Sequence, residues 1–583
     1  MGSPTRLRGL TALTAVTVAA SSYLATGAIA AADTETPGRT ERVVENWGGI
    51  EVREITLDSP MLPAAGPHPP ACDKISYLRY RLTDGPENPE RADAVLVMQP
   101  GATGSAYSMD RVARNTLHDL AAQGKQAEWW SLARRGVCQQ DDTGIEAARA
   151  AGDYRIAIDY YYNHKEIGGK QFPGWRGFWG DKMGADFGVA QTSQDENEIL
   201  TRELPDQRFR QTKTLCGGHS QGGLLTGLFA ATDFTGHRED AGYNQCAGFV
   251  ALDTLVTADP VGLKVDPLFS QLSTLGLALP EAISTALLKF GLAPADNALI
   301  PIFNPQTFNA LSILGLAAQF EPDAESDVLK RLPVTWGLDS TFRVGGANTW
   351  LDALTGANNL RDFRFTNRAA FGQLLSKNGM NIGLDQVSLG ALAGGQVQEK
   401  TFPLPDGLQR IPLIGLGVGG VLGHEKRVGP VDPATLYTWD DYRHTPTTFY
   451  TDPSKEVVDI DDFARMVSGP LGFTEWYFPT RVLYDTFLAL AGSRTGSLSN
   501  IKYNAEVMQK PMITINGTGS VVKDFLDAQD IAASIIPFAP HFQRVLVPNY
   551  THIDTLAGAE TQNDGSPDPV GVAIADFTDR TIG

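Results

Sequence analysis

The chain has 583 residues, of which 42% are hydrophobic and 20% are charged. This composition is typical of a globular protein with a large core, and it excludes a disordered or fibrous chain. Lysine and arginine together number 48 against 67 aspartate and glutamate residues, which gives a formal net charge of -19 at pH 7. Such a charge argues against a nucleic-acid binder and against a partner membrane with an anionic surface. The mean hydropathy of -0.16 excludes a polytopic membrane protein.

The first thirty residues have the pattern of a secretory signal peptide. Arg6 and Arg8 form a positive stretch, a run of apolar and small residues follows, and Ala28-Ile29-Ala30 is typical of a cleavage site. The run is rich in Ala, Thr and Ser, which favours a cleaved signal over a transmembrane anchor. We therefore expect a signal peptide at residues 1–30, a polar lead-in at 31–70, and a secreted protein without a membrane span.

Export makes disulfides possible, and the four cysteines Cys72, Cys138, Cys216 and Cys246 allow three pairings. Cys216 is expected to end one parallel strand and Cys246 to begin the next. That arrangement would place these two at opposite ends of the sheet, beyond the Cα separation of about 7 Å that a disulfide tolerates. We therefore favour a disulfide between Cys72 and Cys138. No cysteine cluster has zinc spacing, and no metal or organic cofactor is implied.

Strands and helices alternate from residue 71 onward. Period-two alternation or short apolar runs predict strands at 74–82, 92–98, 127–132, 212–216, 247–252, 511–515 and 543–547. Helices are predicted at 109–124, 191–204 and 221–231. Repeated β–α units imply a mostly parallel sheet with helices on both faces.

The alternation stops for about 250 residues. This block contains apolar helical stretches, a Gly-rich apolar piece and an aromatic polar section, at 268–291, 308–320, 411–423 and 437–450. We interpret it as a large, mainly helical cap at 255–508, inserted between late strands of one α/β core that comprises 71–254 and 509–583.

The pentapeptide Gly218-His219-Ser220-Gln221-Gly222 has the pattern G-x-S-x-G. A predicted strand precedes it and an apolar helix follows it, which is the context of a nucleophile elbow. There a serine hydroxyl is exposed on a tight, strained turn, and the flanking glycines let strand and helix pack against that turn. We interpret Ser220 as a nucleophile; the alternative is a serine that caps a helix at an ordinary turn.

A serine nucleophile needs a general base, and His552 has the expected place after the last predicted strand. The alternative for His552 is an ordinary loop histidine. His541 precedes the same strand, and His219 is expected to pack beneath the turn. His424 and His444 fall in the predicted cap, where solvated surface is favoured over substrate contact.

The acid that orients the histidine has several candidates. The loop after the penultimate predicted strand carries no carboxylate before Asp524, whereas Asp253 lies at the carboxyl end of an earlier strand. We favour Asp253, and Asp524, Asp527 and Asp554 remain alternatives. The other reading of Asp253 is a helix or turn cap at the start of the insertion.

Backbone N–H groups are expected to form the oxyanion hole. Gln221, directly after the nucleophile, offers one donor, and Ala102 in the Gly-rich loop 99–104 offers the other. The alternative for this loop is a simple Gly-rich turn.

Together these residues resemble the α/β-hydrolase superfamily and, within it, a group of secreted actinobacterial serine hydrolases. The stretches that carry the resemblance are 71–81, 99–101, 153–162, 215–223, 243–254 and 549–554. The resemblance implies the α/β-hydrolase fold, a serine hydrolase that cleaves esters or amides, and tolerance of a missing acid after the late strand, which favours Asp253. The polar segment 138–142 departs from the D-x-R-G turn of many members, so loop contacts there are not carried over.

We therefore expect acyl transfer to water through Ser220, His552 and Asp253, on a small-molecule or lipid-like carboxylic ester. The apolar cap suggests a lipophilic substrate, although those stretches can equally pack the core of the cap. Aromatic residues considered for the pocket, with core packing as the default, are Trp439, Tyr442, Trp476 and Tyr477.

Two other functions remain open. An exported aminopeptidase would need an acidic group for the substrate ammonium, and the candidates are Glu475 and the run 459–462. A non-catalytic binding protein on a hydrolase scaffold would be indicated by a broken triad. The sequence does not determine the oligomeric state.

Overall fold

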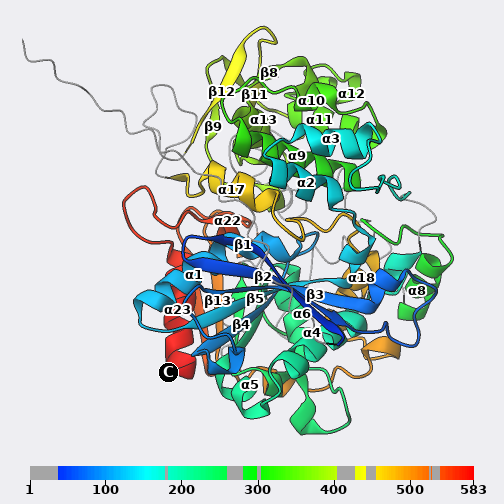
Figure 1. The fold of residues 1–583 in the computed structure, drawn as a ribbon, viewed down its shortest axis with the longest axis vertical. Coiled ribbons are helices and arrows are strands. Elements are labelled where there is room, and N and C mark those ends of the chain that lie inside the picture. The colour runs from blue at the N-terminus through cyan, green and yellow to red at the C-terminus, as the bar shows by residue number, and fades with distance from the viewer. Residues whose placement is uncertain are drawn as a thin grey trace, which may run out of the picture.

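The computed structural model describes residues 37–177, 182–258, 280–297, 304–403, 427–441, 455–520, 522–523, 527 and 539–583. Figure 1 shows a large sheet flanked by helices, with a second layer of helices and short strands over one end of it. The predicted signal peptide, the Gly-rich piece 411–423 and the candidates His424, Tyr442, His444 and Asp524 lie outside the described residues.

Within the described ranges, nine strands form one sheet in the order β1-β2-β3-β5-β4-β6-β7-β13-β14. Their bounds are β1 Arg39–Trp47, β2 Ile50–Asp58, β3 Lys74–Leu82, β4 Ala94–Gln99, β5 Ala127–Ala133, β6 Thr214–His219, β7 Gly248–Leu252, β13 Met512–Gly517 and β14 Phe542–Val547. β3 is antiparallel to both its neighbours, and every pairing from β5 to β14 is parallel. This is the predicted α/β-hydrolase fold.

Both faces of the sheet are buried, as the apolar runs of its central strands require. Along β4, Leu96 and Met98 pack into the core on one face, while Val95 and Val97 pack into the core on the other. The first core lies under helices α1 Asp110–Ala122 and α23 Pro569–Ile582. The second lies under α4 Val189–Glu203, α5 Gln207–Lys213, α6 Gln221–Ala230 and α18 Thr480–Leu490.

The long insertion separates β7 from β13, which nevertheless pair in parallel. Its helices and strands are α8 Glu281–Lys289, α9 Pro305–Phe320, α10 Val328–Arg331, α11 Trp336–Gly346, α12 Trp350–Thr355, β8 Arg364–Phe365, α13 Asn367–Leu375, β9 Ala391–Ala393, β10 Val397–Glu399, β11 Val428–Pro430, β12 Leu436–Asp440, α17 Ile460–Val467, α18 and α19 Asn504–Val507. Most of them form the upper layer in Figure 1, whereas α8 and α18 lie beside the sheet.

Two helices from the earlier part of the chain also belong to the upper layer. α2 Thr143–Ala151 and α3 Arg155–Tyr162 lie next to α9 in Figure 1, and α2 contacts α9. The upper layer is therefore assembled from two separate parts of the chain. The boundaries at residues 255 and 508 stay a prediction.

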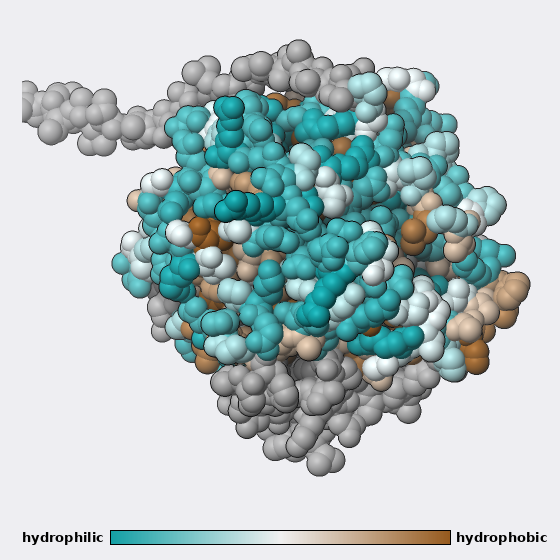
Figure 2. Space-filling model, turned by 90° about the horizontal axis from the view of Figure 1, so that it is seen from below, coloured by the Kyte–Doolittle hydropathy of each residue, from teal (hydrophilic) through white to brown (hydrophobic). Residues whose placement is uncertain are grey.

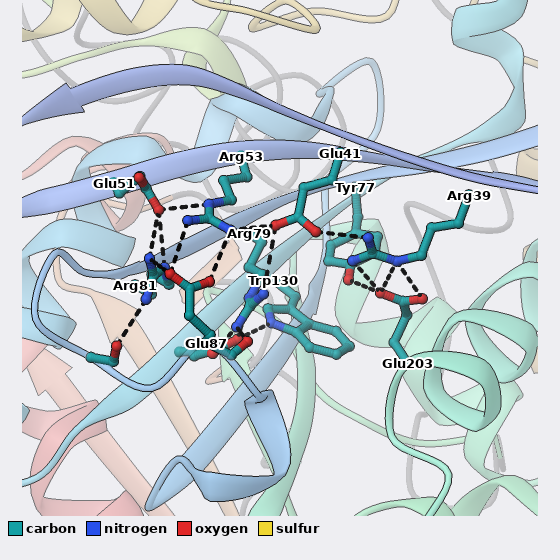
Figure 3. Close-up of polar contacts among 12 residues, drawn as sticks. Arg39, Glu41, Glu51, Arg53, Tyr77, Arg79, Arg81, Glu87, Trp130 and Glu203 are labelled. Atoms are coloured by element: carbon teal, nitrogen blue, oxygen red, sulfur yellow. Dashed lines mark hydrogen bonds and ion pairs between the residues drawn. The ribbon is translucent and has the colours of Figure 1, made fainter. Parts of the chain in front are cut away.

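Strands β1 and β2 were not predicted, because residues 31–70 were interpreted as a polar lead-in. Charged side chains cover this edge of the sheet (Figure 3). Glu41 accepts hydrogen bonds from Arg39 at 2.7 Å and from Arg53 at 2.8 Å. Arg39 also donates to Glu203 of α4 at 3.0 Å, which joins the edge to a flanking helix. A charged edge of this kind opposes pairing with a further strand.

Two disulfides are present among the described residues. Cys72 and Cys138, the pair that the sequence favoured, are bonded with a Cα–Cα distance of 5.1 Å. Cys216 and Cys246 are bonded as well, at 5.8 Å, so the exclusion of this pair was wrong.

The error came from the bounds of strand β6. The sequence predicted a strand ending at Cys216, but residues up to Lys213 belong to α5 and the strand runs from Thr214 to His219. Cys216 therefore lies in the first half of β6, where its register partner is Phe249. Phe249 lies in β7, three residues after Cys246, which precedes that strand, so both cysteines lie at the same end of the sheet.

Hydrophilic residues dominate the face in Figure 2, with apolar residues scattered among them. This surface fits the strongly acidic composition. None of the helices in the described ranges has the length and apolarity needed to cross a lipid bilayer.

Candidate active site

Ser220 lies on the turn between β6 and α6, with backbone angles of φ 53° and ψ −125°. A positive φ is strained for a residue with a side chain, and such strain is characteristic of a nucleophile elbow. The backbone N–H of Ser220 donates to the carbonyl of Leu252 at the end of β7, at 3.0 Å. A Cβ atom at Gly222 would collide with the carbonyls of Gln99 and Pro100, so this position of the motif requires glycine.

His552 and Asp253 meet above the carboxyl ends of the parallel strands. His552 follows β14, and its Nδ1 atom lies 2.5 Å from Oδ2 of Asp253, which follows β7. Both side chains are buried. Since the carboxylate accepts, Nδ1 donates, and Nε2 is the ring nitrogen that faces away from this bond.

A second donor to Asp253 was not found from the sequence. The hydroxyl of Ser520, in the loop after β13, donates to the same Oδ2 atom, and Asn516 donates to Oδ1 at 3.4 Å. The end of β13 and the loop after it therefore supply an amide and a hydroxyl donor to an acid that follows the neighbouring strand β7. In the sequence, the signal for these two donors was an asparagine and a serine after the predicted strand 511–515.

Two of the other acid candidates are bonded elsewhere. Asp554 accepts from the backbone N–H groups of Thr551 and Ser388, at 2.7 and 2.8 Å. Asp527 forms ion pairs with Lys523 and Arg544. Among the described candidates, Asp253 is thus the one bonded to His552.

His219 packs beneath the turn, as expected. Its ring lies 4.4 Å from the His552 ring, between centroids, and its Nε2 atom is 3.1 Å from the carbonyl oxygen of His552. Burial, together with the nearby His552, holds the pKa of His219 well below its usual range, so the ring is neutral. His541 is exposed at the start of β14.

The loop after β4 lies directly against the elbow. Gln99 is the register partner of Gly218, so the two strand ends lie side by side. A Cβ atom on Gly101 would stand only 2.8 Å from Nδ1 of His219 and 3.1 Å from Cβ of Ser220. Ala102 lines the same cavity as Ser220, and Gln221 is the first residue of α6.

A buried ion pair supports this loop, and the sequence analysis missed its role. Arg134, just after β5, donates to Oε2 of Glu475 at 2.8 Å. Its guanidinium also donates to the carbonyls of Pro100, Gly101 and Gly104, at 2.8, 2.8 and 2.6 Å. One arginine side chain therefore binds three carbonyls of the candidate oxyanion loop.

The elbow opens into a cavity whose empty space, together with the open solvent at its mouth, amounts to about 1360 Å³. Ser220 and His552 line it on the side of the sheet, and helices α9, α13 and α17 line it from above. Apolar side chains dominate the lining; they include Phe308, Leu311, Leu374, Phe463, Phe473 and Leu556. The cavity is therefore suited to an apolar substrate group.

The aromatic residues considered for the pocket serve the core instead. Trp439 packs against Gly372 and donates to the carbonyl of Leu389 at 2.9 Å. Trp476 packs against Tyr161, and Tyr477 is also buried. None of these three lines the cavity.

The acids considered for an ammonium group also lie outside the cavity lining. Glu475 is bonded to Arg134, and Asp459 accepts from backbone N–H groups at the start of α17. Asp461 and Asp462 form ion pairs with Arg368 and Arg111. A carboxyl that the sequence analysis did not single out, Asp385, lines the cavity instead.

Neither a protein-family model nor a curated protein matches the chain. Among solved structures it is similar to the peroxisomal α/β-hydrolase Lpx1 of Saccharomyces cerevisiae, at 11% identity and a TM-score of 0.33 over 91% of this chain and 90% of that one. It is also similar to an epoxide hydrolase from an endophytic Streptomyces, at 12% identity and a TM-score of 0.32 over 93% of this chain and 96% of that one. A third similar structure is a monoacylglycerol lipase from Paleococcus ferrophilus, at 11% identity and a TM-score of 0.31 over 87% of this chain and 99% of that one. The α/β-hydrolase fold therefore rests on the chain's own strand order and elbow.

Proposed function

We propose that this protein is a secreted serine hydrolase that cleaves carboxylic esters through Ser220, His552 and Asp253. One observation carries the proposal. A serine on a strained turn between strand and helix shares a cavity with a histidine whose other ring nitrogen is bonded to a buried aspartate. This combination supplies a nucleophile, a base and an orienting acid.

The reaction proceeds in two acyl transfers. His552 Nε2 accepts the proton of Ser220 as the hydroxyl oxygen attacks the ester carbonyl, and the negative oxygen accepts hydrogen bonds from the N–H groups of Ala102 and Gln221. His552 then gives its proton to the leaving alcohol. Water repeats the sequence on the acyl-enzyme and releases the acid.

The apolar lining of the cavity supports a lipophilic ester as substrate. Export is supported by the signal-like segment at residues 1–30 and by the two disulfides, which persist in oxidising compartments. The resemblance to secreted actinobacterial hydrolases belongs to the same proposal.

A fluorophosphonate probe tests the nucleophile. The wild type is expected to be labelled, and Ser220→Ala and His552→Ala are expected to abolish labelling. Ser108→Ala is the matched control, because this serine also lines the cavity but bonds the carbonyl of Ser105. Labelling that persists in Ser220→Ala, or ester hydrolysis that survives it, would refute the assignment.

Two further comparisons complete the test. If Asp253→Asn keeps nearly full activity while Asp524→Asn abolishes it, the acid is wrongly assigned. A panel of p-nitrophenyl esters of increasing chain length, beside aminoacyl-nitroanilides, tests the bond that is cleaved. Cleavage of the nitroanilides alone would favour the aminopeptidase alternative.

A further inference from the structure

Asp385 is a carboxyl group in the cavity that the proposed mechanism does not use. It ends the short helix η11 Gly383–Asp385, which follows α13 and precedes β9 along the chain. It lines the same cavity as Ser220 and His552. A charged residue type at this place is unexpected, because its neighbours in the lining, such as Ile382 and Leu384, are apolar.

The segment that follows Asp385 is bonded to the loop that carries His552. The hydroxyl of Thr551 donates to the carbonyl of Gln386 at 2.6 Å, and the N–H of Ser388 donates to Asp554 at 2.8 Å. Asp385 therefore keeps a fixed position on the histidine side of the cavity.

One oxygen of the Asp385 carboxyl group lacks the hydrogen-bond partner that buried acids normally have. The Oδ2 atom of Asp385 is inaccessible to solvent and accepts no hydrogen bond from the residues that the structure describes. Both oxygens of Asp253 and of Asp554, in contrast, accept hydrogen bonds. A buried polar atom without a partner costs stability, so its presence in a binding cavity points to a ligand.

Electrostatics agree with this geometry. Burial raises the pKa of Asp385 to about 7, and its electrostatic interaction with the nearby His552 opposes the rise. A carboxyl of this kind gains a strong hydrogen bond when a donor enters the cavity, and an ion pair when that donor is a cation.

We propose that Asp385 binds a hydrogen-bond donor of the substrate, a hydroxyl or an ammonium group near the scissile ester bond, and so selects substituted acyl groups over plain ones. The proposal rests on the ester hydrolase function proposed above. It makes Asp385 a specificity-determining residue in a cavity that is otherwise apolar.

Three p-nitrophenyl esters of equal length test it: the hexanoate, the 2-hydroxyhexanoate and the 2-aminohexanoate. The measured quantity is kcat/KM of each substituted ester divided by that of the hexanoate. In Asp385→Leu this ratio is expected to fall about tenfold to a hundredfold, since a hydrogen bond to a charged group is lost. In Asp385→Asn the amide oxygen still accepts, so the hydroxyl ratio is expected to fall less than the ammonium ratio.

Asp362 provides the matched control. It ends a helix of the same kind, η10 Leu360–Asp362, but is exposed. Asp362→Leu is expected to leave both ratios unchanged. A fall confined to the hydroxyl ester or to the amino ester supports the proposal and identifies the donor.

Ratios that stay within twofold in Asp385→Leu and Asp385→Asn would overturn the proposal, as would an equal change in Asp362→Leu. If Asp385→Leu does not fold, the nearly isosteric Asp385→Asn provides the test, and the deciding quantity is its kcat/KM ratio for the amino ester. Failure of the proposed function looks different, since the wild type would then cleave none of the three esters and the inference would fall with it.

Discussion

The Arg134–Glu475 pair offers a direct test of how the oxyanion loop is held in place. Arg134→Met removes the hydrogen bonds to the carbonyls of Pro100, Gly101 and Gly104 together with the bond to Glu475. Both partners of the pair are almost fully buried. The variant therefore leaves an uncompensated carboxylate in the interior and a loop without its donor.

Two magnitudes follow from these contacts. Breaking a buried ion pair by removing one partner costs about 3–5 kcal/mol of stability. An oxyanion donor is worth about 2.7–4 kcal/mol in the transition state, so a loop displaced far enough to lose its donor is expected to lower kcat by about a hundredfold to a thousandfold. The double variant Arg134→Met/Glu475→Gln removes the stranded charge, so it is expected to recover most of the stability but not the activity.

The assay combines urea unfolding with kcat for p-nitrophenyl hexanoate. The neighbouring pair Arg135–Asp195 is the matched control, because Arg135 is equally buried and binds the carbonyls of Ser59 and Cys72 instead. Arg135→Met/Asp195→Asn is expected to change stability without a comparable loss of kcat. Full recovery of kcat in Arg134→Met/Glu475→Gln would refute the reasoning, since Arg134 would then serve only to neutralise Glu475.

Three other outcomes are expected. Burial raises the pKa of Glu196 to about 8, so the folded protein binds more protons than the unfolded chain and loses stability as pH rises from about 4.5 through 8. In urea unfolding, Glu196→Gln should therefore be more stable than wild type at pH 9 and equal to it near pH 5. A difference in stability that stays constant with pH would contradict this. Cys216→Ala/Cys246→Ala removes a disulfide that closes a loop with a sequence separation of 30, so it should lower the free energy of unfolding by about 3.5 kcal/mol in denaturant unfolding. An unchanged denaturant midpoint would count against the disulfide. Gly101→Ala brings a methyl group to 2.8 Å from His219 and should lower kcat about tenfold, with only a small change in melting temperature. A variant with the kcat of the wild type would show that the loop lies elsewhere.

Local periodicity and chain order made much of the fold predictable. The alternation in 74–82 gave the bounds of β3 correctly, and the apolar run of β4 reflects a strand buried on both faces. The strand before Ser220 and the helix after it are local features as well. Chain order singled out His552 because the histidine follows the last strand of such a sheet.

Features that depend on contacts between distant segments were missed or mistaken. The predicted strand 212–216 began two residues and ended three residues before the observed β6, which placed Cys216 at the wrong end of the sheet, because strand ends are weakly marked in sequence. Strands β1 and β2 were missed because their charged residues pair with one another and with α4, which no local pattern reveals.

The sequence by itself determined the alternating α/β core, the turn at Ser220 and the late histidine, since these follow from short-range patterns. Only the tertiary structure decided which acid contacts His552, how Arg134 reaches the oxyanion loop, and that Asp385 enters the cavity. The first two contacts join residues separated by 299 and by 30 to 34 positions, and the cavity brings Asp385 together with Ser220 and His552, which are 165 and 167 positions away. Packing rather than spacing brings such residues together.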